Sequence, residues 1–237
     1  MWTGTSPGIA TTIEPTAVRI AVDAGTVIDG DLTIPETAAG IVVFAHGSGS
    51  SRHSPRNRLV ARTLVERGFT TLLADLLTTG EEEVDARTGE LRFDIARLAT
   101  RLAGITAWVE NEPGTASLPV GYFGASTGAA AALVAAAQLP ARVAAVVSRG
   151  GRADLAGEAL TAVEAPTLLI VGGRDEVVLD LNRRALDQMK VERELVIIPG
   201  AGHLFEEQGA LGEVSRLAAG WFRRYLSPAP AVQTDGP

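Results

Sequence analysis

The sequence predicts an α/β protein with a mostly parallel central sheet of about eight strands, an antiparallel hairpin at its start and helices on both faces. Short apolar runs rich in β-branched residues recur along the chain and alternate with longer segments of helical spacing. The first two runs are separated by only a few residues, Asp23-Ala24-Gly25, which indicates a hairpin. A length of 237 residues with 46% hydrophobic residues suits one such domain.

The expected strands span 18–22, 27–34, 40–45, 70–74, 120–123, 143–147, 167–171 and 195–198. The expected helices span 56–67, 93–110, 127–138, 179–189 and 206–225. Residues 152–165 leave no room for a cap domain, and the acidic segment 78–90 is interpreted as a loop that either borders the site or is simply solvated. We expect one domain over 1–226 and a disordered proline-rich tail over 227–237.

Composition narrows the choice of partners. The chain carries 28 acidic and 21 basic residues, and this net charge of −7 gives no reason to expect nucleic acid or an anionic membrane. The longest apolar run, 129–137, has about half of the roughly 20 residues that cross a bilayer. Residues 1–8 lack the features of an export signal, so we expect a cytoplasmic protein. It should be a monomer or a homodimer, since an exposed edge strand allows pairing.

The absence of cysteine excludes disulfides, thiolate metal sites and a cysteine nucleophile. Ser126 offers another nucleophile. It lies in Gly124-Ala125-Ser126-Thr127-Gly128, which follows an expected strand and opens an alanine-rich helix. In the G-x-S-x-G nucleophile elbow the serine occupies a sharp strand-to-helix turn, and the glycines avoid clashes there. The alternative is a structural serine in a tight turn.

Two further residues follow Ser126 in the order that this motif requires, which is serine, acid, histidine. Asp175 lies four residues past the end of the expected strand 167–171, and His203 comes in a glycine-rich loop after 195–198. Glu176 is a weaker candidate for the acid, because Asp175 fits the strand end better. A helix-capping role for Asp175 and an ordinary loop histidine at 203 are the alternatives.

With these landmarks in place, the chain resembles an α/β-hydrolase, most similar to the lidless branch that is like the dienelactone hydrolases. Dienelactone hydrolases proper have cysteine at the elbow, whereas this chain has Ser126, so their lactone substrate is not carried over. The resemblance implies that Ser126 attacks a carbonyl, that His203 moves the proton and that Asp175 orients His203. No metal and no organic cofactor are implied.

The same resemblance implies an oxyanion hole made of the backbone N–H of Thr127 and a donor in the turn after the third strand. We assign that donor to Ser48, with Gly47 letting the backbone approach the substrate; the alternative is an ordinary serine-rich loop. Arg149 follows a strand at the edge where open sheets place ligands, so we expect it to bind an anionic group of the substrate. An arginine paired with an acidic residue or backbone carbonyls is the alternative.

The predicted function is a serine hydrolase that cleaves a small or medium carboxylic ester, thioester or lactone through an acyl-enzyme. Acyl transfer to an acceptor other than water uses the same residues and stays open. A catalytically idle hydrolase fold that serves as a binding or scaffolding module is the second hypothesis, because fold alone does not guarantee activity.

Overall fold

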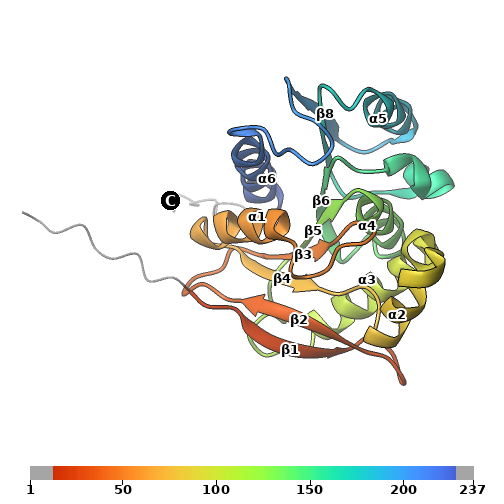
Figure 1. The fold of residues 1–237 in the computed structure, drawn as a ribbon. Helices are drawn as coiled ribbons and strands as arrows, with labels where there is room; N and C mark the ends of the chain where they lie inside the picture. The colour runs from red at the N-terminus through yellow and green to blue at the C-terminus, as the bar shows by residue number, and fades with distance from the viewer. Residues whose placement is uncertain (1–12, 228–237) are drawn as a thin grey trace, which may run out of the picture.

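The computed structural model describes residues 13–227, which form a central sheet covered by helices on both faces (Figure 1). Its strands are β1 (Thr16–Ala21), β2 (Val27–Thr33), β3 (Ile41–Ala45), β4 (Thr70–Ala74), β5 (Val120–Ala125), β6 (Val143–Arg149), β7 (Thr167–Gly172) and β8 (Arg193–Ile198). They lie side by side in the order β1-β2-β4-β3-β5-β6-β7-β8. The predicted eight-stranded α/β-hydrolase sheet is thereby confirmed.

The direction of the strands also follows the prediction. β1 pairs with β2 and β2 with β4 in antiparallel fashion, and every later pairing is parallel. β5 lies in the middle of the parallel part, between β3 and β6. Because parallel strands end at one edge of the sheet, the segments that follow β3, β5, β6, β7 and β8 can build one site there.

Helices cover both faces of the sheet (Figure 1). α1 (Pro55–Glu66) and α6 (Ala210–Leu226) pack on the first face, where Val60, Leu64 and Phe222 join a buried apolar cluster. α3 (Ile95–Val109), α4 (Thr127–Gln138) and α5 (Glu176–Gln188) lie on the second face. The alanines of α4 are almost all buried, which lets the helix lie close under the sheet.

The prediction of a loop over 78–90 is wrong. Residues Thr79–Thr88 form helix α2, followed by the short 3₁₀ turn η1 (Leu91–Phe93). A capping box starts α2, because the Thr78 hydroxyl accepts a hydrogen bond from the Glu81 N–H and the Glu81 carboxylate accepts one from the Thr78 N–H. The acidic residues that suggested a solvated loop therefore belong to the first turns of a helix, where negative charge is favourable.

Other boundaries shift by a few residues. β5 and β6 each extend two residues past the expected end, so Arg149 is the last residue of a strand, and α5 begins at Glu176 rather than at 179. The segment between β6 and β7 forms only the short helical stretch η2 (Ala153–Ala162), as the prediction without a cap domain requires. Of the predicted tail 227–237, all but Ser227 lies outside the described residues, as does the N-terminal segment 1–8.

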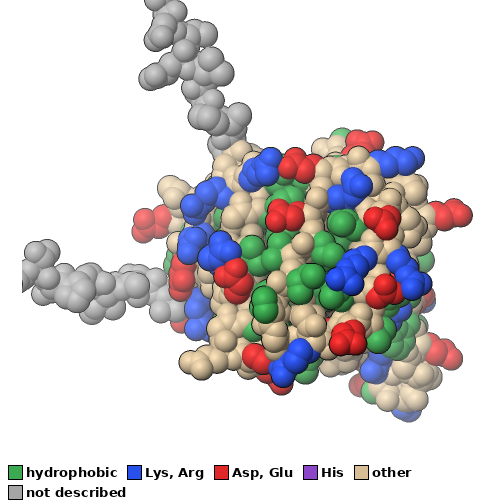
Figure 2. Space-filling view, turned by 90° about the horizontal axis from the view of Figure 1, so that it is seen from above, with side chains coloured by type: hydrophobic (Ala, Val, Ile, Leu, Met, Phe, Trp, Pro, Cys, Tyr) green, Lys and Arg blue, Asp and Glu red, His purple; other side chains and the backbone are tan. Residues whose placement is uncertain are grey.

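The edge strand β8 leaves apolar side chains at the surface. Ile197 of β8 and Val177 at the start of α5 are 39% and 73% exposed. Figure 2 views the molecule from above relative to Figure 1. Apolar side chains gather in the middle of the visible surface, and charged side chains lie around them. The expected monomer or homodimer stays a prediction. Within 13–227, every helix is too short or too polar to cross a membrane.

Candidate active site

Ser126 occupies the turn between β5 and α4. Its backbone has φ 49° and ψ −122°, a combination that residues other than glycine rarely adopt. The flanking glycines make the turn possible: a Cβ on Gly124 would lie 2.4 Å from the Cα of Ala129, and a Cβ on Gly128 would lie 2.2 Å from the carbonyl oxygen of Ala45. The local geometry is that of the predicted nucleophile elbow.

Asp175 and His203 meet at the same edge of the sheet. His203 Nδ1 lies 2.6 Å from Asp175 Oδ2, with His203 partly exposed and Asp175 largely shielded. Asp175 stands at the N-cap position of α5, yet its side chain makes no capping hydrogen bond. The carboxylate is thus directed to the histidine rather than to the helix, while Glu176 is exposed. This arrangement favours Asp175 over Glu176 as the acid.

An ion pair connects the loops that carry these two residues, and sequence reasoning missed it. Glu207 accepts hydrogen bonds from the Gly202 N–H at 3.1 Å, and it pairs with Arg174. Bonds from the backbone N–H groups of Glu207 itself and of Gly202 lower the pKa of the Glu207 carboxyl. The residue before Asp175 is thereby connected to the residue before His203. Nothing in the local sequence signals a contact between positions so far apart.

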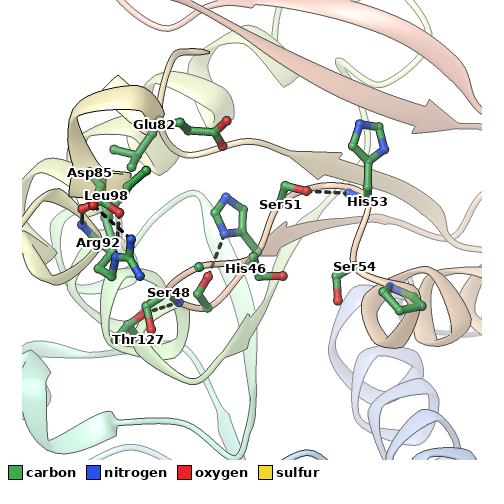
Figure 3. A pocket seen from close by; sticks show the side chains of 16 residues that line it. His46, Ser48, Ser51, His53, Ser54, Glu82, Asp85, Arg92, Leu98 and Thr127 are labelled. Atoms are coloured by element: carbon green, nitrogen blue, oxygen red, sulfur yellow. Dashed lines mark hydrogen bonds and ion pairs between the residues drawn. The ribbon is translucent and has the colours of Figure 1, made fainter. Parts of the chain in front are cut away.

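The turn after β3 lies against the elbow, as predicted. A Cβ on Gly47 would lie 3.0 Å from the Cβ of Ser126, so glycine allows this close approach. The Ser48 N–H, however, donates to the Thr127 hydroxyl at 2.9 Å, as Figure 3 shows. The two residues assigned to the oxyanion hole are therefore neighbours, and the Ser48 donor has a protein partner in the free protein. The Thr127 N–H lies in the first turn of α4, where helix N–H groups have no partner within the helix.

His46 fixes the start of this turn (Figure 3). Its Nε2 accepts a hydrogen bond from the Leu76 N–H at 3.1 Å, so the ring proton lies on Nδ1, which donates to the Gly47 carbonyl at 3.0 Å. Burial lowers the pKa of His46, so the ring is neutral around pH 7. Since both ring nitrogens are engaged with the backbone, the role of His46 is structural.

This burial predicts a pH-dependent stability. The folded state holds His46 neutral, whereas the unfolded chain protonates it below about pH 6.5, so the free energy of unfolding falls as the pH drops below that value. The loss is at most about 1.4 kcal/mol per pH unit. Urea unfolding from pH 8 to 5 should show a steeper decline of the free energy of unfolding for the native chain than for His46→Gln. Parallel curves would contradict this interpretation.

Two cavities flank the turn. One, of about 250 Å³, is lined by Gly47, Ser48, Ser50, Ser54, Arg56, Asn57, Ala125, Ser126, Arg149, His203 and Leu204. The other, of about 460 Å³, opens toward α2 and η1 and includes His46, Glu82, Asp85 and Arg92 (Figure 3). Gly47, Ser48, Ser50 and Ser54 line both. A substrate at Ser126 therefore has space on both sides of the turn.

The arginines that follow β3 and those that end or follow β6 have different environments. Arg52 and Arg58 pair with Asp31, and Arg152 pairs with Asp154 at 2.8 Å. None of these three arginines lines the smaller cavity. Arg56 and Arg149, in contrast, both line that cavity. The structure thus brings together Ser126, His203, Asp175, Ser48, Thr127, Gly47 and Arg149 at one edge of the sheet.

A strained serine after a central parallel strand, followed in the chain by an aspartate–histidine pair on later strand ends, defines the α/β-hydrolase class. The model of the dienelactone hydrolase family matches residues 28–227, and the chain belongs to this family.

Solved structures of similar proteins have the same fold. A dienelactone hydrolase from Anabaena variabilis is 58% identical, with a TM-score of 0.89 over 91% of this chain and 99% of that protein. Est1E from Butyrivibrio proteoclasticus has a TM-score of 0.73 at 16% identity over 88% of this chain and 98% of its own, which shows a shared fold. A curated protein of Mycobacterium tuberculosis described as a putative phosphoribosyl transferase is 59% identical over 215 residues. That match covers 90% of this chain but 48% of the relative, so the chain spans about half of the relative's length.

Proposed function

We propose that this chain is a serine hydrolase that cleaves a small or medium carboxylic ester, thioester or lactone through an acyl-enzyme. The observation that carries the proposal is the 2.6 Å bond from His203 to Asp175 at a cavity that His203 shares with the strained Ser126. A serine hydroxyl is a poor nucleophile without an adjacent base, and a neutral histidine oriented by a carboxylate is the base that this chemistry uses.

In the first half-reaction Ser126 Oγ forms a bond to the substrate carbonyl carbon while His203 takes the hydroxyl proton. The bond to the leaving oxygen or sulfur then breaks, and the imidazolium gives its proton to that atom. In the second half a water molecule attacks the acyl-enzyme, His203 takes a proton from it, and the acid is released as Ser126 regains its proton. Asp175 stays ionised and stabilises the imidazolium in both halves.

The negative charge on the carbonyl oxygen requires donors placed in advance, and we assign them to the N–H groups of Thr127 and Ser48. Both lie next to the elbow, and Gly47 permits the close approach. Because the Ser48 N–H is bonded to the Thr127 hydroxyl in the free protein, the substrate oxygen has to share or replace that acceptor. The threonine hydroxyl then keeps the donor oriented before substrate binds.

Three other functions compete with this one. Phosphoribosyl transfer is part of the description of relatives about twice as long, and the hydrolase family match covers most of this chain, so we do not propose it here. A catalytically idle binding module has no need for a strained serine in the same cavity as an aspartate-bound histidine. Acyl transfer instead of hydrolysis uses the same site. The cytoplasmic location and the oligomeric state stay predictions.

The experiment that tests the proposal combines covalent labelling with turnover. A fluorophosphonate probe should label Ser126, and 4-nitrophenyl esters from acetate to decanoate should be hydrolysed, with rates that rank the acyl length. The small cavity of about 250 Å³ around Ser126 favours the shorter acyl groups. If neither labelling nor turnover is observed, the binding module becomes the better assignment. Labelling without turnover would show that the substrate class is wrong.

A further inference from the structure

Arg149 lies next to the candidate nucleophile but has no counter-ion among residues 13–227. It is the last residue of β6, its Cα is paired with Ala125 in the sheet, and its carbonyl accepts a hydrogen bond from the Ser126 N–H at 3.3 Å. The Arg149 residue is only 6% exposed and lines the cavity that contains Ser126 and His203. A permanent cation is therefore built into the wall of the reaction cavity.

The contacts of Arg149 do not neutralise it. Its Nη2 donates to the Asn57 side-chain oxygen at 3.2 Å, and its guanidinium lies 5.9 Å from the centre of the Phe205 ring. Its Nε is buried without a hydrogen-bond partner, and none of the ion pairs within 13–227 includes it. Burial and the neighbouring charge of Arg56 lower the pKa of Arg149 to about 10, so it is still charged at neutral pH. A buried charge of this kind is costly unless an anion accompanies it.

The charged side chains that line the small cavity are all positive. Its lining includes Arg56 and Arg149 and not one aspartate or glutamate, in a chain with 28 acidic residues. Arg56 pairs with Glu206 at 3.3 Å, but Glu206 is largely exposed and outside the lining. Both Arg56 and Asn57 come from the first turn of α1, which has no acidic residue and whose N-terminus carries partial positive charge.

We propose that the substrate carries an anionic oxygen group, a carboxylate or a phosphate, on its acyl part, and that Arg149, Arg56 and the N-terminus of α1 bind it. This rests on the proposed function, because the acyl part is the portion bonded to Ser126 within this cavity. The larger cavity, on the other side of the turn after β3, has room for the leaving group. Arg149 is thus a specificity-determining residue that selects anionic acyl groups.

The test compares esters that differ only at the far end of the acyl chain. Mono-4-nitrophenyl adipate, 4-nitrophenyl 5-phosphonopentanoate and neutral 4-nitrophenyl hexanoate share one chain length and one leaving group. We expect the native chain to prefer an anionic ester by at least about 10-fold in kcat/KM, since hydrogen bonds to charged groups are the strong ones. The better of the two anionic esters identifies the group as carboxylate or phosphate.

Variants test whether the preference for anionic esters comes from the arginines of the small cavity. Arg149→Met should lower kcat/KM for the anionic ester by about 10- to 100-fold and so reduce or abolish the preference for the anionic over the neutral ester. Arg149→Lys should restore part of the preference, and Arg56→Met should weaken it without touching the buried core. Arg62→Met removes the same charge from an exposed position of α1 and should change neither ester. A native chain that hydrolyses all three esters equally, or prefers hexanoate, would overturn the proposal.

A binding measurement separates this proposal from the catalytic one. In Ser126→Ala, adipate or inorganic phosphate should raise the Tm, and the rise should vanish in Ser126→Ala/Arg149→Met. If the fluorophosphonate labels Ser126 while neither anion stabilises the protein, the anion site is wrong and the hydrolase stands. If labelling fails while the anions still stabilise the chain through Arg149, the site stands without the hydrolase.

Discussion

Replacing Ser126 by alanine is expected to lower kcat by about 10⁶-fold, close to the limit set by binding and the oxyanion donors alone. The reason is that no acyl-enzyme forms without the Oγ, and His203 then has no hydroxyl to activate. Steady-state and burst assays on the best 4-nitrophenyl ester measure the loss. His203→Ala should cost about as much, and the double variant should cost no more than either single one, because the residues act as a unit.

The backbone of the elbow supplies a control. Ser126→Ala keeps the strained φ of 49°, so its free energy of unfolding should stay within about 0.5 kcal/mol of the native chain. Ser126→Gly should be equally inactive but more stable by about 1 kcal/mol, because glycine tolerates this conformation. Activity that survives in both variants would show that another group is the nucleophile. Activity lost together with the fold would show that Ser126 is structural.

Much of this site was predictable because its signals are local. The glycines around Ser126 predict a tight turn. The structure shows why glycine is required there, since a Cβ on Gly128 would clash with the backbone of β3. Asp175 and His203 were found through their positions after apolar strands, and the parallel sheet brings those strand ends to one edge. The mostly parallel sheet was predicted from the same alternation of apolar runs and helical segments.

What escaped prediction depends on distant contacts. The Arg174–Glu207 pair joins two loops that only the sheet brings together. The capping box of α2 was present in the sequence at Thr78 and Glu81, but the density of acidic residues around it favoured a solvated loop. Whether Arg149 had an acidic partner could not be read from its neighbours in sequence, because Asn57 and Phe205 reach it from other elements.

Asp175→Asn is expected to lower kcat by about 10⁴-fold with little change in KM. An amide at this position donates to His203 Nδ1, so the imidazole proton moves to Nε2 and the ring can no longer accept the proton of Ser126. Asparagine has the shape of aspartate and is an equally good N-cap residue. Since the Asp175 side chain makes no capping bond, the Tm should stay within a few degrees.

Glu176→Gln is the matched control, because it removes the same charge from the next residue, which is exposed at the start of α5. It should change kcat by less than about 2-fold. Measuring kcat, KM and Tm for both variants separates orientation of the histidine from general loss of negative charge. If Glu176→Gln cost as much as Asp175→Asn, the 2.6 Å contact between Asp175 and His203 would not be the one that orients the base.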